Sequence, residues 1–323
     1  MLKIAIIGSG FGQYGLLPAF HSIKKCKVVA ICGERRPQLI KYCKGIGLTN
    51  IYSDWRLLLK NEELDAIALA ITPHAQYTIA KAAIKKGLHV FAEKPLAANL
   101  RQARELLALA TKKKITHGID FIFPEIAEWK KTKELVENKS FGKLKHLSVN
   151  WDFLSYDLKN KKITWKMKIK EGGGALSFYF SHGLYYLEYF AGKIISVKGP
   201  ASKTRVDLLL KFQNNISGEA HVNCNNKSLH RHQLIFQCEK GVIILENNKG
   251  VVDNFSIRVF DEKGQRQIKI KKDRGLKNED ERVKIVKKLA TRFINACQAK
   301  KQTTPSFREG AGVQELIEKI RAS

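Results

Sequence analysis

Short apolar runs rich in β-branched residues alternate with helical segments along the first 120 residues. The runs are too short and too uniformly apolar to be amphipathic helices, and they lie at 2–8, 27–32, 66–71, 88–92 and 115–119. Such runs are typical of parallel strands that are buried on both faces. The alternation predicts an α/β fold with an open, doubly wound parallel sheet as a first domain over residues 1–120.

Residues with strong preferences for helix ends stand between these runs. Proline suits the first helical turn, short polar side chains cap it, and glycine commonly follows the last turn. These signals are Pro37, Ser53 or Asp54, and Asn99 with Gln102 at helix starts, and Gly87 at a helix end.

The second half of the chain mixes helices with short runs of alternating apolar and polar residues. Alternating runs at 143–153, 205–212, 217–224, 232–238 and 241–247 are separated by Gly and Asn turn signals. Helical patterns cover 124–139 before these runs, and 278–300 and 309–321 after them. We therefore expect a second α/β domain over residues 121–323.

The composition indicates a globular protein of a reducing compartment. Hydrophobic residues make up 44% of the 323 residues, and no apolar run approaches the roughly 20 residues that span a bilayer. The N-terminus lacks the pattern of a secretory signal peptide. The six cysteines form no CxxC pair, so we expect reduced thiols, a cytoplasmic location and no membrane partner.

The charge balance is strongly basic, with a formal net charge of +28. Such a balance attracts polyanions, and a polyanion-binding protein on an old enzyme fold is one hypothesis. The basic residues are mostly lysines spread along the chain, however, and no nucleic-acid-binding motif accompanies them. We favour a solvated basic surface without a dedicated nucleic-acid site.

A glycine-rich turn follows the first predicted strand, in the sequence Gly8-Ser9-Gly10-Phe11-Gly12. Gly8 permits the tight turn, and Gly10 lets the backbone approach a pyrophosphate at the start of the next helix. The usual third glycine would fall at Gln13, so the pattern is irregular. Its position in a β-α-β unit nevertheless predicts dinucleotide binding over a plain tight turn.

The end of the second predicted strand carries the residues that would choose the cofactor. Glu34 stands 22 residues after Gly12, close to the ~20 expected for an acid that binds the ribose hydroxyls of NAD. Arg35 and Arg36 adjoin it and could instead bind the 2′-phosphate of NADP. Both cofactors remain open, and the two arginines shift the balance slightly toward NADP.

Lys94 follows the fourth predicted strand in the tripeptide Glu-Lys-Pro. Proline disfavours a helical conformation at the residue before it, which holds Lys94 extended at the carboxyl end of a parallel strand. A lysine there can donate to a substrate oxygen and so promote hydride transfer. Taken alone, the tripeptide fits a lysine at the start of a solvent loop better.

Three glycines at 172–174 precede an almost wholly apolar helical run that contains His182. From this helix alone, His182 fits a packed core residue better than a proton donor. The glycines would let the backbone bend sharply into the helix.

Together, these motifs resemble the Gfo/Idh/MocA oxidoreductases, named for glucose–fructose oxidoreductase and inositol dehydrogenase. The resemblance rests on "IIGSGFGQYGLLPAF", "DAIALAITPHAQ", "GLHVFAEKPLAANLRQARELLALA", "GGGALSFYFSHGLYYL" and "PSFREGAGVQELIEKI", in this order over nearly the whole chain. It implies a Rossmann domain followed by an α/β domain with a large, open, mostly antiparallel sheet. It also implies a homo-oligomer, dimer or tetramer, that associates through this sheet.

The resemblance assigns roles to residues that pattern alone leaves ambiguous. It implies that Lys94 and His182 are catalytic, and that Thr72, Pro73, His74 and Glu93 line the cofactor with the glycine turn. The family usually has an aspartate one helical turn before this histidine, whereas here the position is Phe178. Tyr179, Tyr185 or Tyr186 could supply a hydroxyl in its place.

The leading hypothesis is therefore an NAD(P)-dependent oxidoreductase that acts on a secondary alcohol or carbonyl of a sugar, cyclitol or nucleotide-linked sugar. Lys94 would polarise the oxygen and His182 would exchange the proton. The alternative is a redox-inactive dinucleotide-binding sensor or scaffold, which Phe178 supports.

A cluster of soft side chains in the second half raises the possibility of a metal. It comprises His221, Cys224, His230, His232 and Cys238, and its spacing matches no standard zinc framework. We expect no metal site there, and the resemblance places these histidines at a subunit contact instead.

Overall fold

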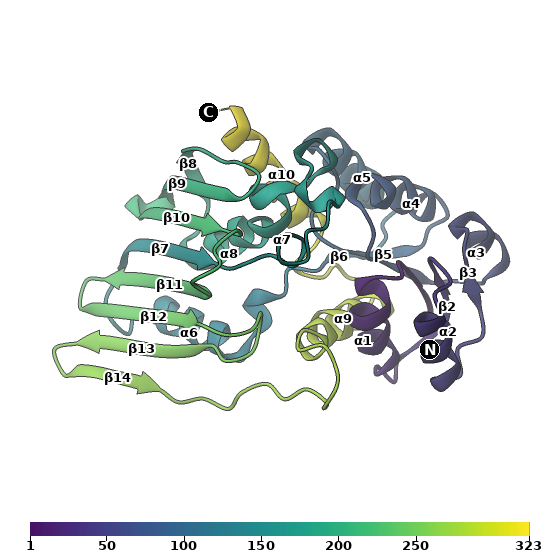
Figure 1. The fold of residues 1–323 in the computed structure, drawn as a ribbon, viewed down its shortest axis with the longest axis horizontal. Coiled ribbons are helices and arrows are strands. Elements are labelled where there is room, and N and C mark those ends of the chain that lie inside the picture. The colour runs from purple at the N-terminus through teal and green to yellow at the C-terminus, as the bar shows by residue number, and fades with distance from the viewer. Residues whose placement is uncertain (323) are drawn as a thin grey trace. The chain divides into compact units, whose positions relative to one another are not determined.

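The computed structural model describes residues 1–322, whose contacts divide the chain into two compact units. The first comprises Met1–Ile122 and Arg274–Gln314, and the second comprises Phe123–Asp273 and the chain from Glu315 on. The sequence boundary at residue 120 assigned everything after it to the second domain, whereas segment 274–314 folds with the first unit. The physical reason is that helix α9 (Val283–Gln298) returns to pack on α1 (Leu17–His21), as Figure 1 shows.

The first unit is built on the predicted Rossmann-type sheet of six parallel strands, in the order β3-β2-β1-β4-β5-β6. The strands are β1 (Leu2–Ile7), β2 (Cys26–Cys32), β3 (Ile51–Tyr52), β4 (Ala66–Leu69), β5 (His89–Ala92) and β6 (His117–Ile119). The five apolar runs correspond to five of them. The two-residue strand β3 is too short to leave a pattern.

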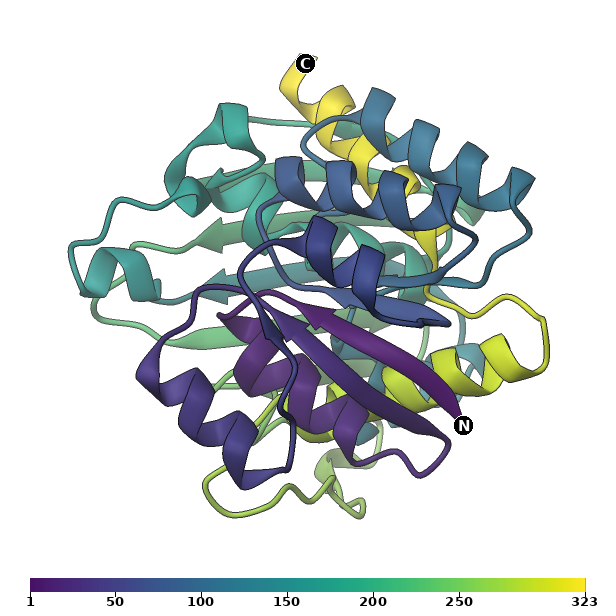
Figure 2. The same ribbon diagram turned by 90° about the vertical axis from the view of Figure 1, so that its right-hand side faces the viewer.

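Helices cover both faces of this sheet. Figure 2 shows α4 and α5 together on one face and α1 with α9 on the other. On the α1/α9 side, Phe20, Phe91 and Phe293 form an edge-to-face cluster that joins these helices to β5. The other helices of this part of the chain are η1 (Gly12–Leu16), α2 (Pro37–Gly45), α3 (Trp55–Asn61), α4 (Pro73–Lys85) and α5 (Leu100–Lys112).

The predicted helix ends are confirmed in detail. Pro37 opens α2, the Asp54 carboxylate accepts from Arg56 N–H at 2.8 Å, and Gly87 follows α4 with φ +81°. Asn99 accepts from Gln102 N–H at 2.9 Å, which caps α5. The reciprocal arm of a capping box is not formed, because Gln102 Oε1 has no hydrogen-bond partner among the described residues.

The second unit contains a mixed eight-stranded sheet in the order β14-β13-β12-β11-β7-β10-β9-β8. Only the central β7–β10 pair is parallel, so the expected mostly antiparallel sheet is confirmed. The strands that were not predicted, β8, β13 and β14, lie toward the two edges. The strands are β7 (Leu144–Asp152), β8 (Ile194–Lys198), β9 (Arg205–Phe212), β10 (Ser217–Asn223), β11 (Arg231–Cys238), β12 (Gly241–Asn247), β13 (Ser256–Asp261) and β14 (Gly264–Ile268).

Helices α6 (Ala127–Glu137) and α8 (Ser181–Ala191) pack on one face of this sheet, where Phe190 meets Phe236 and Trp129 meets Phe255. Side chains alternate along the strands, so the opposite face carries Asp207, Leu209 and other half-exposed or exposed residues. The remaining helical segments are η2 (Phe123–Glu125), α7 (Tyr156–Lys159), η3 (Trp165–Met167), η4 (Ile169–Glu171), η5 (Ala175–Tyr179), η6 (Gln213–Asn215) and α10 (Phe307–Ala322), which spans both units. No helix among residues 1–322 is long and apolar enough to cross a membrane.

Candidate active site

The glycine-rich turn leaves β1 at the carboxyl edge of the parallel sheet. Gly8 has φ +132°, and a Cβ there would lie 2.2 Å from the carbonyl oxygen of Ala70, so only glycine fits. A Cβ on Gly10, in contrast, would meet nothing within 4 Å. The backbone at Gly10 is therefore open to a close approach from outside the protein, as a pyrophosphate requires.

The helix that follows this turn begins as the π-helical segment η1, and an aromatic pair holds it. The Phe11 ring packs edge-to-face on Tyr14 at 5.4 Å. The guanidinium of Arg282 lies over Phe11 at 4.4 Å from its centroid and makes two 2.8 Å hydrogen bonds to Asp280. Segment 274–314 thus braces the glycine turn through a cation–π contact.

The residues after β2 lie beside the same turn. A Cβ on Gly33 would come within 2.6 Å of the Ser9 Cβ, and Glu34 N–H donates to Ser9 Oγ at 3.1 Å. The Glu34 carboxylate accepts from Arg36 Nε at 2.8 Å, and this hydrogen bond lowers the pKa of Glu34. Arg35 donates to the Ile51 carbonyl at 3.4 Å. The Glu34 carboxylate therefore stays ionised, and the adjacent Arg36 guanidinium compensates its charge.

The residues after β4 form the start of α4. Thr72 occupies the N-cap position, buried Pro73 begins the helix, and His74 is exposed. Because β1, β2, β4 and β5 are parallel neighbours, their carboxyl ends lie along one edge of the sheet. The structure thus brings the predicted cofactor-lining residues of this unit to that edge.

Glu93 and Lys94 continue from β5 at this edge, and both are half-buried. Glu93 N–H donates to the Leu69 carbonyl at 2.9 Å, and Lys94 N–H donates to Glu93 Oε2 at 3.0 Å. The Gln76 side chain on α4 holds the loop, because its Nε2 lies 2.6 Å from the carbonyl oxygen of Glu93 and 3.1 Å from those of Pro95 and Leu96. The backbone is thereby fixed on both sides of Lys94.

Asp120 follows β6 and lies next to Glu93 in the sheet register. Its N–H donates to the Ala92 carbonyl at 2.9 Å, and its side chain is 2% exposed. Burial, together with the nearby charge of Glu93, raises the pKa of Asp120 well above its usual value.

In the second unit, the three glycines make the predicted sharp bend into a helix. Gly172 and Gly174 have φ values of +86° and +87°, and a Cβ on Gly173 would lie 2.3 Å from the Trp165 carbonyl oxygen. The helix then starts as the π-helical segment η5, with Phe180 N–H donating to the Ala175 carbonyl at 2.8 Å. π-Helical turns are frequent at functional sites.

His182 lies in the first turn of α8 and is 8% exposed. Its ring packs edge-to-face on Phe123 at 5.0 Å. The flanking Tyr186 does not orient His182, because its hydroxyl lies 3.1 Å from His232 Nε2. Tyr179 packs between Phe153 and Phe178.

Phe178, at the position of the family aspartate, lies in η5 rather than in the regular helix. Its ring packs edge-to-face on Trp165 at 5.2 Å, and the Lys166 ammonium lies over it at 5.1 Å. The side chain is thus part of a half-exposed aromatic group.

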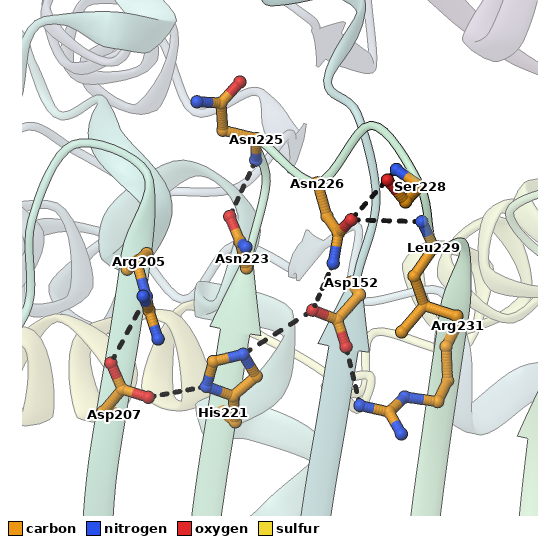
Figure 3. Close-up of polar contacts among 10 residues, drawn as sticks. All are labelled: Asp152, Arg205, Asp207, His221, Asn223, Asn225, Asn226, Ser228, Leu229 and Arg231. Carbon is orange, nitrogen blue, oxygen red and sulfur yellow. Dashed lines mark hydrogen bonds and ion pairs between the residues drawn. The ribbon is translucent and has the colours of Figure 1, made fainter.

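The soft side chains of the second unit are dispersed. His232 is buried on the helix-covered face, so the expectation that it lies at a subunit contact is wrong. His230 precedes β11, and its Nε2 lies 2.9 Å from the Gly250 carbonyl oxygen. His221 lies on the opposite face, 2.6 Å from Asp207 and 3.6 Å from the buried carboxylate of Asp152 (Figure 3). No group of metal-binding side chains occurs among residues 1–322.

Sequence reasoning missed Gln76, Asp120 and Arg282. Gln76 ends one of the quoted family motifs and Asp120 comes directly after an apolar run, but neither was assigned a role. Arg282 braces a turn some 270 residues upstream only because its segment returns to the first unit. A lone buried acid after a parallel strand is the one sequence signal that could have pointed to Asp120.

Comparisons with known proteins place both halves of the chain in one group. Residues 2–121 match the model of an oxidoreductase family with an NAD-binding Rossmann fold, and residues 129–244 match the GFO/IDH/MocA C-terminal domain. An uncharacterized oxidoreductase of Synechocystis sp., sll0816, is 26% identical over 98% of this chain and 92% of its own length. A levoglucosan dehydrogenase of Pseudarthrobacter phenanthrenivorans is 27% identical over 62% of this chain and 54% of its own length.

Solved structures share the complete fold. A levoglucosan dehydrogenase in complex with NADH and levoglucosan superposes with a TM-score of 0.84 at 20% identity, covering 100% of this chain and 96% of that one. The 3-ketoreductase KijD10 of Actinomadura kijaniata, in complex with NADP and TDP-benzene, gives 0.82 at 15% identity, covering 99% and 97%.

Proposed function

Because the chain belongs to the Gfo/Idh/MocA family of oxidoreductases, we propose that it transfers a hydride between a nicotinamide cofactor and a sugar-like substrate. The substrate would be a secondary alcohol or carbonyl of a sugar, cyclitol or nucleotide-linked sugar. The observation that supports the proposal is the shared edge of the parallel sheet, along which the glycine turn, Glu34 and Lys94 follow the carboxyl ends of β1, β2 and β5. The named sugar dehydrogenases among its relatives support this substrate class.

The residues at this edge fit a dinucleotide. The open space beside Gly10 and the backbone of Ser9 to Gly12 suit a pyrophosphate, and Glu34 with Arg35 and Arg36 suits a ribose or its phosphate. When bound, the nicotinamide supplies or accepts the hydride. Thr72, Pro73, His74 and Glu93 would line the remainder of the cofactor.

Gly10→Val tests cofactor binding without disturbing the fold. Its side chain would enter open space and block backbone approach to the pyrophosphate, while the protein itself has room for it. NAD(H) or NADP(H) at millimolar concentration should raise the melting temperature of the parent and not that of the variant. No shift in the parent with either nucleotide would contradict dinucleotide binding at this turn.

Lys94 would donate to the substrate oxygen, and His182 would exchange the proton. Lys94→Ala should reduce turnover by about a hundredfold or more and leave cofactor binding nearly intact. His182→Asn should reduce turnover with little loss of stability. Assays against a panel of sugars, cyclitols and nucleotide-linked sugars would identify the substrate, and unchanged turnover of Lys94→Ala would refute its role.

Cofactor preference follows from the acid and the two arginines. Because Arg36 pairs with Glu34, the Glu34 carboxylate should repel a 2′-phosphate less strongly, which favours NADP. Replacing Arg35 and Arg36 by alanine should weaken NADP binding more than NAD binding in a calorimetric titration. Equal losses for the two cofactors would contradict the NADP preference.

A redox-inactive dinucleotide-binding protein is the second candidate, and Phe178 favours it. Phe178→Asp separates the two. In an active enzyme it should shift the pH profile of turnover by placing a carboxylate near His182. In an inactive protein, stoichiometric cofactor should give no hydride transfer to any panel member, and the variant should only lose stability.

We also propose a homo-oligomer that forms through the open face of the eight-stranded sheet. Leu209 of β9 is 69% exposed on this face, and Figure 3 shows Arg205 and Asp207 of the same strand beside His221 of β10. Leu209→Asp should yield a smaller species in analytical ultracentrifugation, and a monomeric parent would contradict the proposal. The six free thiols support a reducing location, the cytoplasm, which cell fractionation would check.

A further inference from the structure

Two carboxyl groups lie side by side next to Lys94. Ala92 and Ile119 are register partners on the parallel strands β5 and β6, so Glu93 and Asp120 come next on both strands. Backbone hydrogen bonds fix both residues, at 2.9 Å from Glu93 N to the Leu69 carbonyl and at 2.9 Å from Asp120 N to the Ala92 carbonyl. Neighbouring register positions of a parallel sheet point their side chains the same way.

After burial, the pKa of Asp120 is raised by the charge of Glu93 and by a hydrogen bond between the two carboxyl groups. Ionised carboxylates only accept hydrogen bonds, so such a bond requires a proton on one of them. Asp120 is the more buried partner at 2% exposure, and its Oδ1 has no hydrogen-bond partner among the described residues. A charge on that oxygen would be costly, whereas a neutral acid tolerates it. The proton therefore belongs on Asp120.

The charges that face Asp120 are few. Glu93, from the end of β5, favours the protonated form, whereas the Lys94 ammonium and the Arg282 guanidinium favour the ionised form. Arg282 is itself engaged with Asp280 at 2.8 Å. Burial is the largest influence, and it favours the neutral acid.

We propose that Asp120 is a neutral acid at neutral pH that donates to Glu93, so that the pair carries a single negative charge beside Lys94. This inference deepens the proposed function and its second part rests on it, because the pair then places one negative charge instead of two beside the Lys94 ammonium. Ionisation of Asp120 would place two carboxylates beside that ammonium and hold it away from a substrate oxygen. Asp120 is thus a positioning residue for Lys94.

Infrared spectroscopy of the protein without cofactor tests the shared proton directly. The parent at pH 7 should show the carbonyl stretch of a protonated carboxylic acid, which Asp120→Asn should lose and the exposed control Glu262→Gln should keep. Glu93→Gln retains Asp120 and removes a neighbouring charge, so the band should titrate away at lower pH. A parent spectrum without the band, or an unchanged band in Asp120→Asn, overturns the proposal.

Stability against pH gives an independent readout with a fixed sign. A raised pKa in the folded state means that the parent loses stability as pH rises above about 4, the value for an unfolded aspartate, up to the folded pKa. Asp120→Asn should not show this loss. The melting temperature of the variant should therefore rise relative to that of the parent as pH increases from 5 to 8. A constant difference over this range also overturns the proposal.

Turnover distinguishes the positioning role from the proposed function. With a substrate found by panel screening, the parent should show an alkaline decline of kcat that Asp120→Asn removes, with KM for the cofactor unchanged. An infrared band with an unmoved pH profile would refute the positioning role alone. An infrared band without turnover of any panel member would refute the proposed function and leave the shared proton in place.

Discussion

Replacing Gln76 should disturb the loop that carries Lys94 more than its position on an ordinary helix suggests. The Gln76 side chain is 1% exposed, and its Nε2 is the shared donor to the carbonyl groups of Glu93, Pro95 and Leu96. Its two hydrogens can form two good hydrogen bonds at a time, each worth about 1 kcal/mol net. A buried carbonyl left without a donor costs about 1–3 kcal/mol more.

Gln76→Met keeps the volume and removes the donor, so it should cost about 3–5 kcal/mol, or roughly 6–20 °C in melting temperature for a unit of this size. Gln76→Glu should cost more at pH 7, because a carboxylate would face three carbonyl oxygens. Its burial raises the pKa of the new acid, so the deficit should shrink as pH falls toward 4 and the side chain regains a proton to donate.

Thermal unfolding at pH 7 and pH 5 measures both effects. Gln38→Glu, the same change at an exposed position of α2, is the matched control and should shift the midpoint little. The reasoning is wrong if Gln76→Glu melts within about 2 °C of the parent at pH 7, or if its deficit is the same at both pH values.

Three further substitutions test other contacts. Arg282→Met should cost about 2 kcal/mol by removing the cation–π contact with Phe11, and should weaken cofactor affinity in a titration that Arg282→Lys leaves closer to normal. Gly33→Ala should also weaken cofactor binding, because its Cβ would lie 2.6 Å from that of Ser9; unchanged affinity would show that the turn can yield. Burial lowers the pKa of His232 to about 3. The free energy of unfolding of the parent should therefore fall by roughly 2 kcal/mol between pH 6.5 and pH 5, whereas that of His232→Gln should not show this fall. Parallel denaturant titrations of the two proteins across that range would check the last expectation.

The sequence predicted the elements whose patterns are local. The five apolar runs of the Rossmann unit and the caps at Asp54 and Asn99 were correct because burial on both faces and capping leave a local signature. The strands β3 and β14 were not predicted. β3 has only two residues and β14 is an almost wholly exposed edge strand, so neither leaves a pattern of apolar positions.

The candidate site was predictable in part. Positions marked by glycine or by proline, such as Gly8 and Lys94, could be placed from the sequence because the backbone itself demands those residue types. Gln76, Asp120 and Arg282 act through tertiary neighbours that lie far along the chain, and no periodicity encodes such pairings. His182 could be placed on its helix, but the hydrogen bond of Tyr186 to His232 depends on how the helix rotates against the sheet.

Because segment 274–314 returns to the first unit, that unit can be completed only after the second unit has been synthesised. The aromatic cluster of Phe20 and Phe91 is completed by Phe293, so the N-terminal 122 residues leave the ribosome with one apolar flank uncovered. The entire stretch 123–273 emerges before α9 can cover that flank. The unit that starts first is therefore finished late, and a fragment ending at residue 122 should aggregate rather than fold. Any attempt to exchange the second unit between relatives must cut the chain on both sides of the insertion.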